Sequence, residues 1–240
     1  MTKTRVTQER IEAYDKAFEL KNEDKLSVKE IAFVLNVPLG TLCHWFYHGY
    51  HPLGSSNIFD VEQSPELSYV IGAILGDGSL YNKNGKGLID LAVKDREFAE
   101  AFSDAISSVL QKKRNYKVQE YENGNYRVSV CSYQLFRFLK KPIEELEPYA
   151  KAYPNAFLCG LYDAEGSADS ERIRLSNTNP EIIELAKTLL KQLGFKFSVY
   201  YNPEHYGEYV LAIYRKEQLR RFAEEIGFTI LRKQTKLESD

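Results

Sequence analysis

The chain has no long apolar run and little cysteine. Its apolar stretches fall far short of the roughly 18 residues that a membrane-spanning helix needs, and the opening MTKTRVTQER contains no signal-peptide core. We therefore expect an intracellular protein with no membrane partner. Cys43, Cys131 and Cys159 show no Cys-x-x-Cys spacing, so neither a zinc site nor a disulfide framework is indicated.

An excess of basic charge is also missing. The chain carries 32 Lys and Arg against 34 Asp and Glu, for a net charge of -2. A basic domain is the usual mark of a nucleic-acid-binding protein. Net charge averages over all faces, however, so a basic surface is excluded only if the basic residues are evenly spread.

Two short apolar segments share one pattern of small residues. They are YVIGAILGDGSL at Tyr69–Leu80 and FLCGLYDAEGSA at Phe157–Ala168. Residues four apart lie on one face of a helix, and each segment has a pair of small residues at that spacing: Gly72 with Gly76, and Gly160 with Ala164. Since glycine weakens a helix by roughly 0.5 to 1 kcal/mol, the pattern predicts that two helix backbones approach closely along these strips.

The acidic residue at the end of each segment is the candidate for chemistry. If the two strips face each other, Asp77 and Glu165 lie side by side at helix C-termini, which are already negative. A divalent cation relieves that repulsion, and hard oxygen ligands with open positions suit Mg²⁺. The simpler alternative is a pair of buried helices that end in ordinary C-cap glycines with solvated acids.

The pattern around these segments is repeated. Leu91 and Leu175 are separated by the same number of positions as Gln134 and Gln218, so the chain contains two similar lobes. Each lobe reads as helix, strand, strand, helix, strand, strand, helix. We place the lobes at residues 65–153 and 154–240.

The motifs VIGAILGDG at 70–78 and LCGLYDAEG at 158–166 resemble those of a single-chain LAGLIDADG homing endonuclease, of the archaeal intron and intein type. The resemblance covers Pro65 to the C-terminus and implies an α+β fold. Two αββαββα lobes with antiparallel sheets would form a pseudo-twofold saddle over double-stranded DNA. The resemblance also implies a monomer in the cytoplasm or nucleoid of an archaeal prokaryote.

The activity implied by the resemblance is hydrolysis of phosphodiesters in both strands of a long, non-palindromic DNA target. Asp77 and Glu165 would hold Mg²⁺ with the backbone at Gly76 and Ala164, and Lys94 would be the catalytic basic neighbour. Mn²⁺ is the alternative ion, whereas Ca²⁺ would bind without supporting cleavage.

One departure from the family concerns the second motif. Family members often carry Lys three residues after the second acid, where this chain has Ala168. Arg172, Arg174 and Arg215 are the candidate substitutes.

Alternation along the predicted strands separates the charges. We predict hairpin strands at 116–121 with 126–130 and at 195–201 with 209–214, and strands at 87–94 and 172–177. Their outward faces are basic and polar, while most Glu residues lie on the helices behind, so a DNA-binding face is compatible with the net charge. The predicted DNA contacts there are Asp90, Ala92, Lys94, Lys117, Gln119, Tyr121, Arg127, Ser129, Arg172, Arg174, Ser176, Lys196, Ser198 and Tyr200.

Residues 1–56 form a separate all-α unit, joined by a linker at 57–64. The unit resembles a helix-turn-helix with its turn at 36–38, which implies DNA contacts by Thr41 and His44. Because the presumed groove-facing positions of that helix include no Lys or Arg, a structural or protein-contact module is the alternative. His44, His48 and His51 lack a further ligand at metal-binding spacing, so a metal site there is disfavoured.

Two other functions fit the same scaffold. One is a catalytically silent DNA-binding regulator built from LAGLIDADG and helix-turn-helix parts, and the other is an RNA maturase. Such regulators tend to lose one or both acids, whereas Asp77 and Glu165 are both present, which favours the Mg-dependent endonuclease.

Overall fold

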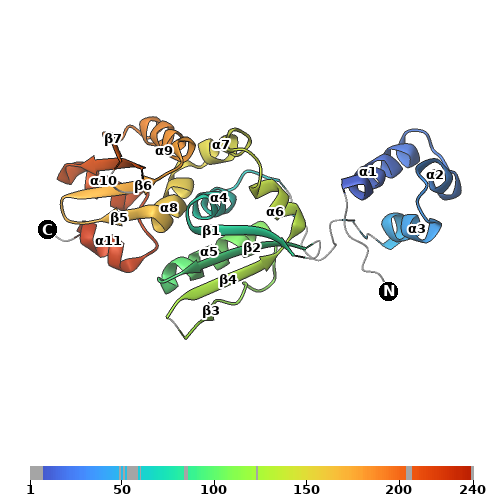
Figure 1. Cartoon of the computed structure of the whole chain (residues 1–240), viewed down its shortest axis with the longest axis horizontal. Helices are drawn as coiled ribbons and strands as arrows, with labels where there is room; N and C mark the ends of the chain where they lie inside the picture. Colours follow the sequence, from blue (N-terminus) through green and yellow to red (C-terminus); the bar gives the residue numbers. More distant parts are fainter. Residues whose placement is uncertain are drawn as a thin grey trace.

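Two antiparallel four-stranded sheets flank a central pair of helices, α4 and α8, in the computed structural model (Figure 1). The structure describes residues 8–48, 50, 52, 59, 61–83, 86–122, 124–203 and 207–238. The strand orders are β1-β2-β4-β3 and β5-β6-β8-β7, so the two sheets have the same topology. The predicted α+β class and the two antiparallel sheets are confirmed.

Each central helix opens one lobe. The first lobe consists of α4 (Pro65–Asp77), β1 (Gly78–Lys83), β2 (Lys86–Val93), α5 (Arg96–Val109), β3 (Gln119–Glu120), β4 (Tyr126–Cys131), α6 (Tyr133–Leu139) and α7 (Ile143–Ala152). The second consists of α8 (Pro154–Glu165), β5 (Gly166–Ala168), β6 (Arg172–Asn177), α9 (Pro180–Gln192), β7 (Ser198–Asn202), β8 (Glu208–Tyr214), α10 (Lys216–Glu225) and α11 (Leu231–Glu238).

Each lobe ends in two helices where the sequence predicted one. In the first lobe, Pro142 separates α6 from α7, because a residue before proline is disfavoured in helical conformation. In the second lobe, Gly227 has a φ of 66° and ends α10 with a left-handed residue. The extra helix α11 matters for the site described below.

The first strand of each predicted hairpin is shorter than expected. Strand β3 is limited to Gln119–Glu120, because the backbone of Tyr116 bonds to the hydroxyls of Ser103 and Ser107 instead of to a strand. Strand β7 begins at Ser198, since the N–H of Lys196 donates to the Gln218 side chain at 3.1 Å. Local side-chain bonds of this kind compete with the sheet for backbone groups.

The inward faces of the long strands form the core. Ile89, Leu91 and Val93 of β2 are buried, and so are Ile173 and Leu175 of β6, as their alternation predicted. Helices α5 and α9 pack against β2 and β6, on the side away from the outward faces. No helix among the described residues combines the length and the apolar character that crossing a bilayer requires.

The N-terminal helices α1 (Gln8–Asn22), α2 (Val28–Leu35) and α3 (Leu39–His48) enclose their own small core. Ser27 and Glu30 form a capping box at the start of α2. Asn36 ends α2 with a φ of 50° and a ψ of 39°, which is the left-handed conformation expected in the predicted turn.

Phe59 lies inside the predicted linker but belongs to the first lobe. Its ring lies 5.2 Å from that of Phe138, centroid to centroid, and its N–H donates to Gln134 at 3.0 Å. Residues 56–58 lie outside the described residues, so the predicted boundary at 56 stays a prediction.

Candidate active site

The seam between α4 and α8 depends on glycine. A Cβ added at Gly72 would lie 2.2 Å from the carbonyl oxygen of Phe157 and 2.9 Å from the backbone nitrogen of Leu161. A Cβ at Gly160 would lie 2.3 Å from the carbonyl oxygen of Tyr69. Both contacts are with backbone, which cannot move aside, so the two helices approach as closely as the sequence predicted.

The same seam brings the two acidic residues together. A Cβ added at Gly76 would lie 2.4 Å from the Cβ of Ala164 and 3.1 Å from the Cγ of Glu165. Asp77 is the next residue along α4, and the two helices end at Asp77 and Glu165. Gly76 and Ala164, whose backbone was predicted to assist metal binding, thus face each other directly beside the acids.

The two carboxylates are electrostatically strained. Loss of hydration raises the pKa of Asp77, and the charge of Lys233 partly offsets that rise. Two causes raise the pKa of Glu165: the larger is loss of hydration, and the second is the negative charge of Asp77. Asp77 is exposed and Glu165 half-buried, and their negative charge is only partly offset, so these two hard oxygen donors fit a divalent cation. Within the described ranges there is no cluster of three or more His, Cys, Asp or Glu, so further ligands would have to be backbone, water or phosphate.

Asn177 orients the second acid. Its side-chain amide donates to Oε1 of Glu165 at 2.9 Å, and its own Oδ1 accepts the N–H of Asn179 at 2.8 Å. Because the amide nitrogen can only donate, this bond requires an acceptor on Glu165 and favours the ionised acid. The sequence placed Asn177 at a strand end without assigning it a role.

A buried lysine, Lys233, provides positive charge near the two acids, and the sequence analysis did not identify it. It is 7% exposed and donates to the carbonyl oxygens of Tyr162 at 3.2 Å and Asp163 at 2.6 Å, in the last turn of α8. Burial lowers the pKa of Lys233 to about 8. A lysine on the same face as Ile230 and Leu237 was the available signal, because a charge on an apolar face needs a buried partner.

A buried carboxylate anchors the turn that precedes α11. Asp163 accepts the N–H of Thr229 at 2.9 Å, the Thr229 hydroxyl at 2.6 Å and the Tyr69 hydroxyl at 2.9 Å. These bonds join α4, α8 and the segment before α11. They hold Lys233 beside the acids from a point far away in the sequence.

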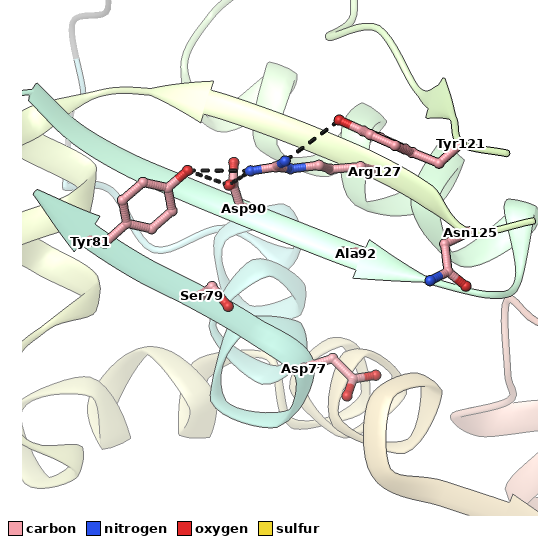
Figure 2. A pocket seen from close by; sticks show the side chains of 8 residues that line it. All are labelled: Asp77, Ser79, Tyr81, Asp90, Ala92, Tyr121, Asn125 and Arg127. Carbon is pink, nitrogen blue, oxygen red and sulfur yellow. Dashed lines mark hydrogen bonds and ion pairs between the residues drawn. The ribbon is translucent and has the colours of Figure 1, made fainter. Parts of the chain in front are cut away.

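A cavity of about 510 Å³ opens beside Asp77 on the outward face of the first sheet (Figure 2). It is lined by Asp77, Ser79, Tyr81, Asp90, Ala92, Tyr121, Asn125 and Arg127. Four of the predicted DNA contacts therefore share one cavity with the first acid. Ser79, Tyr81 and Asn125 were missed, although Ser79 and Tyr81 alternate with the more apolar Leu80.

Asp90 requires a correction. The sequence predicted an outward contact for DNA, but the residue is only 4% exposed. Tyr81 donates its hydroxyl to Asp90 at 2.6 Å, and Arg127 forms an ion pair with the same oxygen. Burial alone would raise the pKa of Asp90, yet these hydrogen bonds lower it below its ordinary value. Asp90 therefore faces the cavity with its carboxylate bonded to Tyr81 and Arg127, instead of standing free on the outward face.

The remaining contacts predicted in the first lobe lie on or beside the sheet. Ser129 is exposed and pairs in register with Asp90, and Gln119 is exposed and pairs with Arg127. Lys117 is exposed but precedes β3. Lys94 is exposed and lies one residue past the end of β2, so its catalytic role stays a prediction.

The predicted contacts in the second lobe gather on β6 and β7. In register, Arg174 lies opposite Ala212, which in turn lies opposite Ser198. Likewise, Ser176 lies opposite Val210, and Val210 lies opposite Tyr200. Arg172 donates to Asp169 at 3.3 Å, and Lys196 is exposed ahead of β7.

The two contacts predicted in the N-terminal unit lie on α3. Thr41 is half-buried, and His44 is exposed with its ring 5.3 Å from that of His48. His51 lies outside the described residues.

Comparison with known proteins gives one family for both lobes. The family model described as a LAGLIDADG-like domain matches residues 64–144 and 152–227. An uncharacterized protein of Methanocaldococcus jannaschii, MJ0398, is 30% identical over 87% of this chain and 83% of its own length. The homing endonuclease I-DmoI of Desulfurococcus mucosus is 26% identical over 64% of this chain and 83% of its own length.

Solved structures agree on the fold. The crystal structure of I-DmoI in complex with DNA and Mn superposes with a TM-score of 0.57, at 24% identity, over 69% of this chain and 98% of that one. Full-length WhiA from Thermatoga maritima superposes with a TM-score of 0.51, at 16% identity, over 76% of this chain and 61% of that one. I-DmoI has also been solved with DNA and Ca.

Proposed function

The chain belongs to the LAGLIDADG-like family, and from this premise we propose that it is a site-specific endonuclease that cleaves both strands of double-stranded DNA. Its similarity to the homing endonuclease I-DmoI and the presence of both seam acids support the proposal. We further propose a monomer that uses Mg²⁺ and recognises a long, non-palindromic target, since the outward faces of its two sheets differ.

Asp77 and Glu165 would hold the divalent cation, with the backbone at Gly76 and Ala164 beside them. When bound, such an ion lowers the pKa of an attacking water and stabilises the leaving oxygen of the phosphodiester. Loss of hydration raises the pKa of both acids, and the negative charge of Asp77 adds to the rise at Glu165. Asn177 orients the Glu165 carboxylate and favours its ionised form, which partly offsets the rise in pKa caused by burial and by Asp77.

Lys233 supplies the positive charge that the second motif lacks at Ala168. Its ammonium is fixed by two carbonyl oxygens of α8, and its charge lowers the pKa of both acids. In the proposed nuclease it would help to stabilise negative charge that develops on the scissile phosphate. Lys94 remains the candidate for that task beside Asp77.

The observation that carries the proposal is that the helices ending in Asp77 and Glu165 meet along a seam with no room for a Cβ at Gly72, Gly76 or Gly160. A merely structural pair of helices would gain nothing from placing two acids where the negative charge of one raises the pKa of the other. Binding of a cation and of DNA phosphates explains why both acids are there.

The test uses the full chain, a library of duplex DNA with a randomised segment, and either Mg²⁺ or Mn²⁺. We expect double-strand cleavage of a defined subset of the library. Asp77→Asn and Glu165→Gln should each reduce cleavage by at least about 100-fold, because each removes a carboxylate that holds the metal, while DNA affinity is retained.

Glu66→Gln is the matched control, because Glu66 lies on the same helix as Asp77 but in its first turn. It should leave cleavage unchanged. Selective DNA binding with no cleavage in either ion would favour the regulator, and selective binding of structured RNA would favour the maturase.

A further inference from the structure

One ion pair on the first sheet is not explained by metal binding. Arg127 lies on β4 and Asp90 on β2, both on the outward face that lines the cavity beside Asp77 (Figure 2). The guanidinium is half-exposed, whereas the carboxylate beneath it is buried. A buried acid under a surface arginine fixes the arginine in one position.

Two tyrosines hold the same guanidinium. Nη2 of Arg127 lies 3.3 Å from the hydroxyl of Tyr81, and Nη1 lies 3.5 Å from the hydroxyl of Tyr121. Both contacts are long for hydrogen bonds, so a better acceptor can replace them. The bond to Asp90 is the strong one, and it occupies only one of the five N–H donors of the side chain.

The positive charge of Arg127 is neutralised by Asp90. Because Asp90 is ionised and directly bonded, the pair contributes no net charge to the surface. Phosphate binding depends mainly on net positive charge and the release of counterions. A neutralised but rigid guanidinium is therefore poorly suited to phosphate and well suited to directional hydrogen bonds with a base edge.

We propose that Arg127, positioned by Asp90, reads a guanine in the DNA segment that lies over the cavity beside Asp77. Arginine pairs with the N7 and O6 acceptors of guanine in the major groove, and this is the commonest specific contact between proteins and DNA. The inference rests on the proposed function, since it requires DNA on this face of the sheet.

The second lobe provides a contrast at the equivalent strand position. Arg174 takes the place in β6 that Asp90 has in β2, as the pairing of Gly166 with Leu175 and of Gly78 with Leu91 shows. Among the described residues, Arg174 has no ion pair. Its full positive charge makes it the matched control for a residue that binds phosphate.

The experiment measures binding of the full chain to the randomised duplex library at several salt concentrations, followed by sequencing of bound and cleaved molecules. For Arg127→Ala, we expect the preference for guanine at one position to fall by roughly 5- to 150-fold, whereas Arg127→Lys should lose less of it because lysine can also donate to the guanine acceptors. Arg127→Lys keeps the charge over Asp90 and so guards against misfolding. Arg174→Ala should weaken binding to all sequences alike and lower the salt dependence by about one phosphate contact.

Two outcomes would overturn the inference. Retention of the guanine preference in Arg127→Ala would show that Arg127 does not read the base, and uniform weakening of binding by Arg127→Ala with a lower salt dependence would make Arg127 a phosphate contact. If the wild-type chain selects no sequence from the library, the proposed function fails as well. Wild-type cleavage together with unchanged base preference in the variants would reject the role of Arg127 alone.

Discussion

At the scale of single residues, the sequence identified the two acids but not the groups that support them. Asp77 and Glu165 stand next to glycines in two related motifs, so their place at the ends of the paired helices can be predicted locally, while their catalytic roles stay a prediction. Asn177 and Lys233 act on Glu165 through contacts that depend on how β6 and α11 pack. Asp90 was misjudged for the same reason, because alternation gives the direction of a side chain but not what covers it.

The buried ammonium of Lys233 predicts a specific pH dependence. Burial lowers its pKa from 10.5 in the unfolded chain to about 8 in the folded protein. Between these values the unfolded state binds more protons, so the stabilising contribution of Lys233 rises with pH. Relative to Lys233→Met, the free energy of unfolding of the wild type should increase by up to about 3 kcal/mol between pH 8 and pH 10.5.

Urea denaturation of both proteins in the presence of EDTA measures this difference. Other titrating groups cancel in the comparison. A difference that stays constant over the interval would show that folding does not lower the pKa of Lys233.

At the scale of secondary-structure elements, small residues predicted the seam, whereas strand ends and the extra helices were not predictable. The seam follows from one strong local requirement, namely the close backbone approach at Gly72 and Gly160. Strand β3 is shortened by hydroxyls of α5 that lie more than eight positions away in the sequence. Competition of this kind leaves no periodic signal in the sequence.

The seam predicts opposite effects for the same substitution at two helical glycines. Gly72→Ala should destabilise the protein by about 1 to 3 kcal/mol or more, because its Cβ would overlap backbone atoms of α8. Gly40→Ala, in α3, has nothing within 4 Å of the added Cβ and should stabilise its helix by about 0.5 to 1 kcal/mol.

Urea denaturation, followed by far-UV circular dichroism, checks both variants. If Gly72→Ala were as harmless as Gly40→Ala, the two central helices would not be in backbone contact.

At the scale of the whole molecule, the N-terminal unit and the two lobes have separate cores. The sequence predicted a unit at 1–56 from its helical patterns and a linker at 57–64, and these bounds stay a prediction. It did not show that Phe59, inside the predicted linker, packs on the first lobe. The available indication of this packing was that Phe59 is a single aromatic residue in a polar stretch.

Truncation tests this division. A chain of residues 57–240 should keep the unfolding midpoint of the two lobes and cleave the same DNA, with lower affinity if α3 contacts DNA. A chain of residues 61–240 loses Phe59 and should be less stable by about 2 kcal/mol. Thermal unfolding and cleavage of the selected DNA measure both effects, and equal stability of the two fragments would contradict the packing of Phe59.

The close approach of Gly76 to the Cβ of Ala164 lies directly beside the acids, and neither residue has a side-chain rotamer that could relax it. In the proposed nuclease, this contact would keep the spacing between the two acids constant. The sheets on either side are then free to diverge and to follow new target sequences. The offset between the cuts in the two strands would then stay the same while the target sequence changes.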